Sequence, residues 1–177
     1  GGEIFENSAC LPPVGGSPCR VDTDGGTVRA GKIFVATHSP FLGISQFEFR
    51  VFPYQSYVIA VRVEDELADA LYWDDADPYH YIRLASPTDP SLVIIGGADH
   101  KTGQASDTPE RYQRLEAWAR ARFPMMGELL FNWGGQIMET QDYLAFIGRN
   151  PMDHENIYVV TGDSGMGLTH GTIAGML

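Results

Sequence analysis

The sequence predicts a mixed α/β (α+β) fold, in which an antiparallel sheet with one main helix lies between two segments of a second, smaller sheet. Two apolar, β-branched runs, Lys32–Thr37 and Ile157–Val160, are typical of buried strands. Between them the chain is rich in short strand patterns and contains one long helical pattern. Because the buried runs bracket this middle part, we expect three regions, 1–49, 50–138 and 139–177, of which the first and last lie together.

The composition excludes some classes of function. The 177 residues are 44% hydrophobic and 20% charged, as is usual for a folded protein. A formal net charge of −11 repels phosphate backbones, so we expect no nucleic-acid partner. No apolar run approaches the ~20 residues of a membrane-spanning helix, and no signal segment begins the chain. We therefore expect no membrane span and a cytoplasmic location.

Two cysteines, Cys10 and Cys19, flank a loop rich in proline and glycine. They could form a disulfide across that loop, but two cysteines without a secretion signal are more often free thiols. No Cys/His grouping has the spacing of metal ligands, so we expect no metal site in this chain.

The first elements are short. Gly2–Phe5 is a strand candidate. Asp24-Gly25-Gly26 separates Cys19–Thr23 from Thr27–Ala30, which predicts a hairpin. The buried run that follows ends at His38-Ser39-Pro40.

The middle of the chain has further strand patterns: Val51–Val61, Tyr79–Ala85, Leu92–Ile95 and Leu129–Thr140. The second of these follows an acidic turn, and its period of two places Tyr79, Tyr81 and Arg83 on one face. Gly96-Gly97 is predicted to close the third strand.

One helix is predicted over Thr108–Phe123. Asp107 is its expected N-cap, Pro109 and Glu110 are favourable in the first turn, and Pro124 ends it.

The last stretch of the chain is the most informative for function. The strand Ile157–Val160 is followed by four glycines within ten residues, and small and apolar residues from Thr169 to Leu177 can begin a helix. A turn of this kind places unpaired N–H groups at the positive end of a helix dipole, where negative charge is stabilised.

Three interpretations of this stretch remain open. The glycines of a tight βα turn can simply permit close packing, in a non-catalytic binding module. Gly162-Asp163-Ser164-Gly165 also matches the start of the nucleophile motif of trypsin-like proteases, which would make Ser164 the nucleophile of a serine hydrolase, with His170 six residues further on. The third interpretation is a flavin site.

The stretch resembles the C-terminal FAD-binding segment of FAD-dependent oxidoreductases of the D-amino-acid oxidase, glycine oxidase and sarcosine oxidase family. It is most similar to bacterial members fused to a Rieske iron–sulfur domain. The resemblance implies cofactor contacts from the end of the first buried strand and from the glycine turn: Thr37, Gly162, Asp163, Gly165, Met166, Gly167, Leu168 and Thr169. Most amine-oxidising members have His at the position of Asp163.

The same resemblance implies the roles of the three regions. Residues 1–49 and 139–177 would form part of an FAD-binding (Rossmann-like) domain, and 50–138 would form the substrate domain, entered at Tyr54-Gln55-Ser56 where the family usually has Arg-Gly-Gln. The substrate-side candidates are Tyr54, Tyr81 and Arg83. The implied reaction is oxidation of an amine, an amino acid or a related C–H donor, a small molecule, by hydride transfer to FAD.

The resemblance covers only the latter part of a family member. The N-terminal Gly-x-Gly-x-x-Gly unit that holds the pyrophosphate of FAD is absent, so we expect an internal fragment of a longer protein. Alone, this fragment should lack FAD, be inactive and self-associate through exposed sheet edges. A [2Fe–2S] cluster would belong to a missing C-terminal domain.

Overall fold

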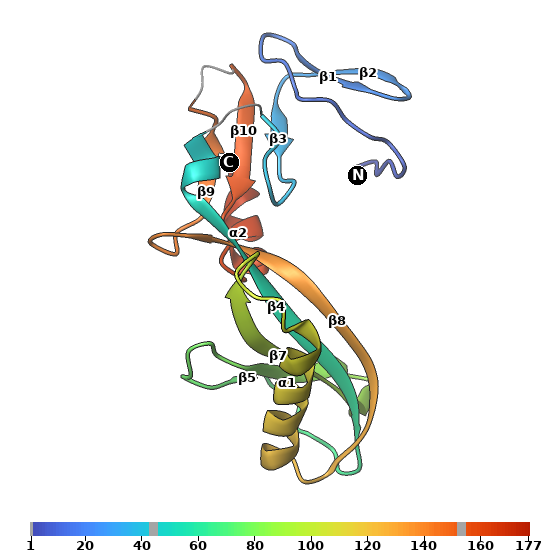
Figure 1. Cartoon of the computed structure of the whole chain (residues 1–177). Helices are drawn as coiled ribbons and strands as arrows, with labels where there is room; N and C mark the ends of the chain where they lie inside the picture. The colour runs from blue at the N-terminus through green and yellow to red at the C-terminus, as the bar shows by residue number, and fades with distance from the viewer. Residues whose placement is uncertain (1, 43–45, 152–154) are drawn as a thin grey trace. The chain divides into compact units, whose positions relative to one another are not determined.

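The computed structural model describes residues 2–42, 46–151 and 155–177 (Figure 1). The chain divides into two compact units. The split unit consists of Gly1–Phe52 and Met138–Leu177, and the central unit is Pro53–Ile137. Both crossings between the units lie within long strands, β4 (Val51–Val63) and β8 (Met126–Thr140).

The split unit is built on a three-stranded sheet of order β3-β10-β9, with bounds Ile33–Val35, Ile157–Thr161 and Phe146–Arg149. β10 pairs parallel to β3 and antiparallel to β9. This confirms that the two buried runs, though more than 120 residues apart in sequence, share a sheet. The run predicted as Lys32–Thr37 forms a strand only over the residues that pair with β10.

The remaining elements of the split unit are a hairpin and two helical segments. Strands β1 (Cys19–Thr23) and β2 (Gly26–Ala30) pair in antiparallel register around the Asp24-Gly25 turn, which confirms the predicted hairpin. A 3₁₀ turn η1 (Gln46–Phe49) precedes β4, and helix α2 (Gly167–Ala174) follows β10.

One expectation for this unit is wrong, and the helix after the turn is confirmed with a different first residue. Gly2–Phe5 is not a strand, and the side chains of Ile4 and Phe5 are 92% and 77% exposed. A strand needs a partner for its backbone groups, and this segment has none among the described residues. Helix α2 begins two residues before the expected Thr169, because Gly167 and Leu168 already have helical geometry.

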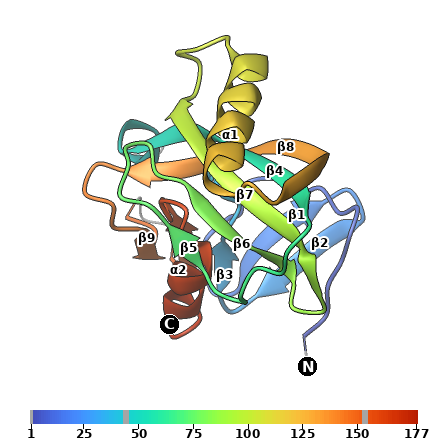
Figure 2. The ribbon, with the colours of Figure 1, turned by 90° about the horizontal axis from the view of Figure 1, so that it is seen from below.

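The central unit contains a five-stranded sheet of order β5-β6-β7-β4-β8. Here β5 spans Tyr72–Trp73, β6 Tyr81–Ser86 and β7 Asp89–Lys101. Helix α1 (Thr108–Arg122) covers one face of this sheet (Figure 2). Leu115 and Ala119 of α1 pack on alternate residues of β4, β6 and β7, and together they form the core: Tyr57, Ile59, Val61, Ile82, Leu84, Val93 and Ile95.

Strand β7 differs from the prediction, because Gly96-Gly97 does not end it. Instead the strand continues through a bulge: Tyr57 of β4 is opposite Gly97, and Gln55 is opposite His100. Gly97 (φ 145°) and Ala98 (φ 57°) have the positive φ that lets the strand accommodate the extra residue. A glycine pair in a strand pattern thus marked a bulge rather than a strand end.

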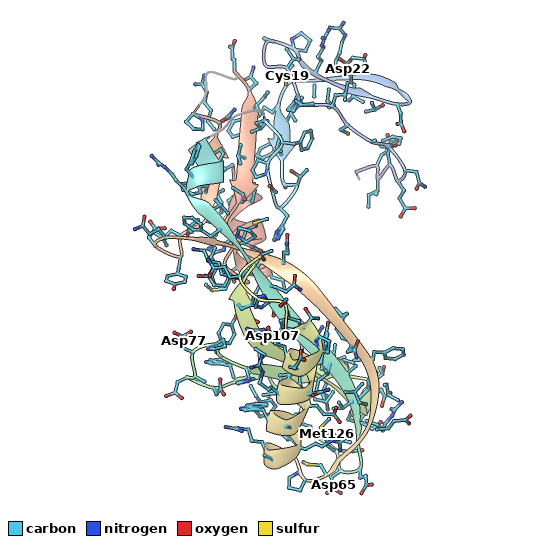
Figure 3. The ribbon with its side chains drawn as sticks, viewed as in Figure 1. Cys19, Asp22, Asp65, Asp77, Asp107 and Met126 are labelled. Carbon is cyan, nitrogen blue, oxygen red and sulfur yellow. The ribbon has the colours of Figure 1, made fainter. Side chains whose placement is uncertain are left out.

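Helix α1 is found where the sequence predicts it, but Asp107 does not cap it through its side chain. Its carboxylate binds the guanidinium groups of Arg111 and Arg114 instead. The helix ends at Arg122, just before Phe123-Pro124. Figure 3 shows Asp107 at the start of α1 and Met126 beyond its far end.

No helix in the described part of the chain is long and apolar enough to cross a bilayer. Cys10 is exposed, Cys19 is buried, and both are free thiols, so the alternative of a disulfide between them is wrong.

Candidate active site

The glycine turn joins β10 to α2 in the split unit. Gly162, Ser164 and Gly165 all have φ in the left-handed region, at 72°, 49° and 78°. A Cβ on Gly162 would lie 2.5 Å from Cγ2 of Thr140, so glycine is required there on two grounds. Gly162 and Gly165 therefore stand where the turn adopts the left-handed backbone conformation that glycine favours.

The backbone of the turn is held by three hydrogen bonds. The Ser164 amide donates to the carbonyl of Met138 (3.0 Å), and the Met166 amide donates to that of Asp163 (2.8 Å). The His170 Nδ1–H donates to the same Asp163 carbonyl (3.0 Å). These contacts fix the direction in which α2 leaves the sheet.

The N-terminus of α2 has no side-chain cap. Helix geometry leaves the amides of Gly167, Leu168 and Thr169 without intrahelical partners. Together with the helix dipole they attract negative charge. These residues are three of those for which the family resemblance implies cofactor contacts.

A hollow of about 240 Å³ lies where β3 and β10 end and α2 begins. Its lining residues come from the segment just after β3, the end of β10, the turn and α2: Ala36, His38, Val160, Thr161, Gly162, Asp163, Gly167, His170 and Gly171. The carboxyl end of parallel strands beside a helix N-terminus is where open α/β sheets bind ligands.

Only some of the predicted cofactor residues line this hollow. Gly162, Asp163 and Gly167 line it. Thr37 lies between two lining residues, but its hydroxyl donates to the Ser39 carbonyl (3.0 Å). The side chains of Met166 and Leu168 are 52% and 93% exposed, and Gly165 and Thr169 are exposed neighbours of the hollow in the turn and the helix.

Six of the lining residues are not among the predicted cofactor contacts: Ala36, His38, Val160, Thr161, His170 and Gly171. Thr161 donates from Oγ1 to the carbonyl of His38 (2.6 Å), which ties the ends of β3 and β10 together. The sequence signal that could have identified these residues was the end of each predicted strand. The residues just after two paired parallel strands meet at the same edge of the sheet.

The turn does not form a hydrolase site. The side chain of Ser164 is 9% exposed, and its Oγ is buried without a hydrogen-bond partner among the described residues. His170 directs Nδ1 to the Asp163 carbonyl rather than to this serine. A serine nucleophile needs a base within hydrogen-bond reach, and the described residues supply none.

The three substrate-side candidates lie on one face of the central sheet. Tyr57 and Ile82 face α1, so their strand neighbours, among them Ser56 and Tyr81, face the opposite side. The same alternation places Tyr54 and Arg83 on that opposite face, where Arg83 donates to the carbonyl of Leu84 (2.9 Å). We call this surface of the central sheet the open face.

Two residues of the open face were not predicted, Ser56 and Asp99. Burial raises the pKa of the Asp99 carboxyl, against the opposing effects of Ser56, His80 and Arg111. Burial also raises the pKa of the Tyr81 phenol, with a further contribution from Asp99, while Ser56 and Arg83 act against it. A buried carboxyl with a perturbed pKa is a common property of functional sites.

No cluster of three or more His, Cys, Asp or Glu side chains suited to a metal ion occurs among residues 2–42, 46–151 and 155–177.

A hollow at the carboxyl end of two parallel strands, with an uncapped helix beside it, is typical of α/β proteins that bind ligands at this edge of their sheet. The chain belongs to the FAD-dependent oxidoreductase family, whose profile matches residues 1–177. This confirms the family resemblance seen in the sequence.

Solved structures with this fold include glycine oxidases and a proline dehydrogenase. Glycine oxidase from Geobacillus kaustophilus is 19% identical with a TM-score of 0.76, over 98% of this chain and 47% of that one. Glycine oxidase from Bacillus cereus ATCC 14579 is 18% identical with a TM-score of 0.74, over 98% and 49%. L-proline dehydrogenase from P. horikoshii is 17% identical with a TM-score of 0.75, over 98% and 48%. The mixed α/β fold predicted from the sequence is thereby confirmed.

A curated relative is the putative Rieske 2Fe-2S iron–sulfur protein of Bacillus subtilis (strain 168). It is 27% identical over 179 residues, which cover 100% of this chain and 35% of the relative. The chain thus spans about a third of this relative and about half of the glycine oxidases.

Proposed function

We propose that this chain is part of a longer FAD-dependent oxidoreductase that oxidises an amine, an amino acid or a related C–H donor. The observation that carries the proposal is the uncapped N-terminus of α2 at the hollow where β3 and β10 end. The family membership supports the cofactor, and the names of the fold neighbours, glycine oxidase and L-proline dehydrogenase, support an amine-bearing substrate.

In this proposal the two units have different roles. The split unit, residues 1–49 and 139–177 in the division expected from the sequence, would hold the cofactor. The central unit, residues 50–138, would hold a small-molecule substrate against its open face. Tyr54, Tyr81 and Arg83 are the candidates for substrate contact, because all three lie on that face.

The residues of the hollow fit the ring end of the cofactor. A Cβ on Gly167 would lie 2.8 Å from Oδ2 of Asp163, so any other residue would require this carboxylate to shift, and glycine leaves the backbone at the helix start bare. The amides of Gly167, Leu168 and Thr169 would stabilise negative charge without rearrangement. Gly162 and Asp163 line the same hollow, and Thr37, Gly165 and Met166 are proposed contacts at its margin.

Bound FAD would supply the hydride acceptor. The chain's own residues would position the substrate and stabilise charge, and the proposal needs no side-chain base within the turn. This agrees with the buried Ser164 Oγ, which has no hydrogen-bond partner in the described part of the chain.

The iron–sulfur cluster is proposed for a part of the longer protein outside this chain. Its support is the Rieske name of the Bacillus subtilis relative, of which this chain covers 35%. A reducing, cytoplasmic compartment is proposed from the two free thiols.

Gly167→Val in the longer protein tests the assignment of the turn. The valine side chain would meet Asp163 and occupy the approach to the amides, so we expect loss of most bound FAD with the fold retained. The measurement is flavin absorbance per protein, with circular dichroism for the fold. Gly31→Val is the control, because a Cβ there meets nothing within 4 Å. Unchanged flavin content in Gly167→Val contradicts the assignment.

A further inference from the structure

The hollow beside α2 is lined by one carboxylate and two histidines. Asp163 lines it from the turn, His38 from the segment just after β3, and His170 from the first turn of α2. The other described lining residues are glycines, apolar residues and one threonine. Among the described lining residues, therefore, only the two histidines can become positively charged.

The carboxylate of Asp163 has no positively charged partner in the described part of the chain. It forms no ion pair there. Its Oδ2 would lie 2.8 Å from a Cβ on Gly167, so it is close to the start of α2, where the helix dipole favours a negative charge. Asp163 thus places a negative charge in the hollow where the amides of α2 would also receive one.

Reduction of a flavin in this hollow would add a second negative charge. A hydride carries two electrons and one proton, so its transfer to a neutral ring leaves one negative charge on that ring. Like charges repel more strongly in a partly buried site than in water. The Asp163 carboxylate therefore opposes reduction, and a positive charge gained at the same time would offset this effect.

The ring of His170 is held by the backbone of the turn. Its Nδ1 lies 3.0 Å from the carbonyl oxygen of Asp163. A carbonyl oxygen only accepts, so Nδ1 carries a hydrogen whether the ring is neutral or charged. A further proton can therefore bind only at Nε2, which has no hydrogen-bond partner among the described residues. His170 can thus gain and lose a proton without losing the contact that orients it.

The second histidine of the hollow, His38, is more exposed. Its carbonyl accepts a hydrogen bond from Thr161 Oγ1 (2.6 Å), but its side chain is exposed, whereas His170 is half-buried. Water and salt screen an exposed charge more than a half-buried one. A charge on His170 therefore acts more strongly on other charges in the hollow than a charge on His38.

The neighbouring elements carry few other charged groups. Helix α2 packs against β9, which carries Arg149, and the turn is bonded to β8 beside Glu139. Arg149 is opposite Tyr158, near the start of β10, whereas the hollow lies at the end of that strand. Neither Arg149 nor Glu139 lines the hollow. Asp163 and His38 are thus the titratable groups that line the hollow together with His170.

We propose that His170 binds a proton at Nε2 when a flavin in this hollow is reduced, and that it thereby makes the reduction potential depend on pH. This inference rests on the proposed function and adds a regulation of the same site. The amine substrate gives up a hydride to the cofactor and a proton from its nitrogen, and His170 takes up one proton. The negative charge gained by the cofactor is then balanced by the positive charge gained by His170.

The test is the midpoint potential of the flavin in the longer, FAD-containing protein, measured between about pH 5 and 8, where histidine side chains change charge. Each proton bound on reduction changes the equilibrium constant tenfold per pH unit, which is about 30 mV for a two-electron couple. One proton arrives with the hydride and the second binds His170. We therefore expect the wild-type potential to fall by about 60 mV per pH unit over part of this range.

Three variants assign the second proton. In His170→Asn the amide nitrogen takes the place of Nδ1 as the donor to the Asp163 carbonyl, but the side chain does not titrate. His170→Gln is a second non-titrating variant, so the test remains valid if His170→Asn fails to fold. Both should show about 30 mV per pH unit throughout. His38→Gln is the matched control, because it removes the other histidine of the hollow, and it should keep the wild-type slope.

Three outcomes overturn the inference. A wild-type slope of about 30 mV per pH unit throughout would show that no second proton is bound. A steeper slope that persists in the His170 variants would place the second proton elsewhere, as on the cofactor itself. Loss of the steeper slope in His38→Gln would assign the proton to that histidine. A protein that binds no FAD, or whose flavin no amine reduces, contradicts the proposed function instead.

Discussion

At the scale of single residues, the position of the Tyr81 ring depends on the absence of a side chain at Gly96. Gly96→Ala would place a methyl carbon within the phenol ring as it now lies, so Tyr81 must move off the strand. We expect a loss of about 1–3 kcal/mol in the free energy of unfolding, as for other overpacking substitutions. Denaturant unfolding measures it.

The control for Gly96→Ala is Gly135→Ala on β8, where a Cβ meets nothing within 4 Å. This substitution should change the free energy of unfolding by less than about 0.5 kcal/mol, in line with surface positions. Equal losses at the two glycines would show that the position of Tyr81 does not depend on Gly96.

The hollow residues that the family resemblance implied are those with a local sequence pattern. Gly162 and Gly167 could be predicted because a strand, a glycine turn and a helix start are adjacent in sequence. Ser56 and Asp99 were missed because their relation arises from pairing between β4 and β7 and from a bulge. A serine and an aspartate 43 residues apart carry no local pattern that distinguishes them from surface residues.

At the scale of elements, helix α1 depends on its core residues. Leu115 is 1% exposed and packs with Ala119 against the sheet. Leu115→Ala should reduce the free energy of unfolding by about 2–5 kcal/mol, because it removes buried methyl groups and leaves a cavity. Gln113→Ala, on the exposed side of the same helix, should cost less than about 0.5 kcal/mol. Comparable unfolding midpoints for the two variants would contradict this packing.

The N-terminus of α1 is expected to depend on pH. Hydrogen bonds from Arg111, and then Arg114, lower the pKa of the Asp107 carboxyl to about 2. Its usual pKa, about 3.9, applies in the unfolded chain. A lowered pKa in the folded state contributes stability that is complete above about pH 4 and is lost as the pH falls toward 2.

Asp107→Asn should therefore lower the Tm above about pH 4, and the difference from the wild type should disappear near pH 2. Thermal unfolding at a series of pH values measures this. Asp75→Asn, in the exposed turn before β6, serves as the control, and its difference from the wild type should not follow this course. A pH-independent difference for Asp107→Asn would refute the role of the ion pairs.

The existence of most elements could be predicted from periodicity, but several boundaries could not. The helix Thr108–Arg122 and the hairpin follow from local patterns. The ends of β7 were set by pairing: its outer residues read as polar or glycine-rich, yet they pair with β4 as far as Lys101. Strand β5 is only two residues long, and it exists because β6 offers it partners.

At the scale of the whole molecule, the sheet of the split unit has an apolar strand at one edge. Strand β3 is at the edge of the order β3-β10-β9, although its sequence is apolar, as in strands buried between neighbours. Phe34 on β3 is 43% exposed and stacks on Tyr158 of β10, with ring centroids 4.9 Å apart. An apolar strand at an open edge offers unpaired backbone groups to another chain.

The last prediction concerns residues 1–177 produced alone. The family's N-terminal glycine loop, which would hold the pyrophosphate of FAD, has no counterpart in this sequence, and each missing donor to a charged group weakens binding by ~1.5–3 kcal/mol. The uncapped turn at Gly167 would remain, but it offers only the contacts to the ring end. We therefore expect a colourless protein that is inactive toward amines and self-associates through the edge of β3. Titration with FAD, followed by flavin fluorescence, measures the binding, and sedimentation measures the association. Saturable binding at or below micromolar FAD would show that the turn alone makes the site, and a strictly monomeric chain would show that the β3 edge is protected.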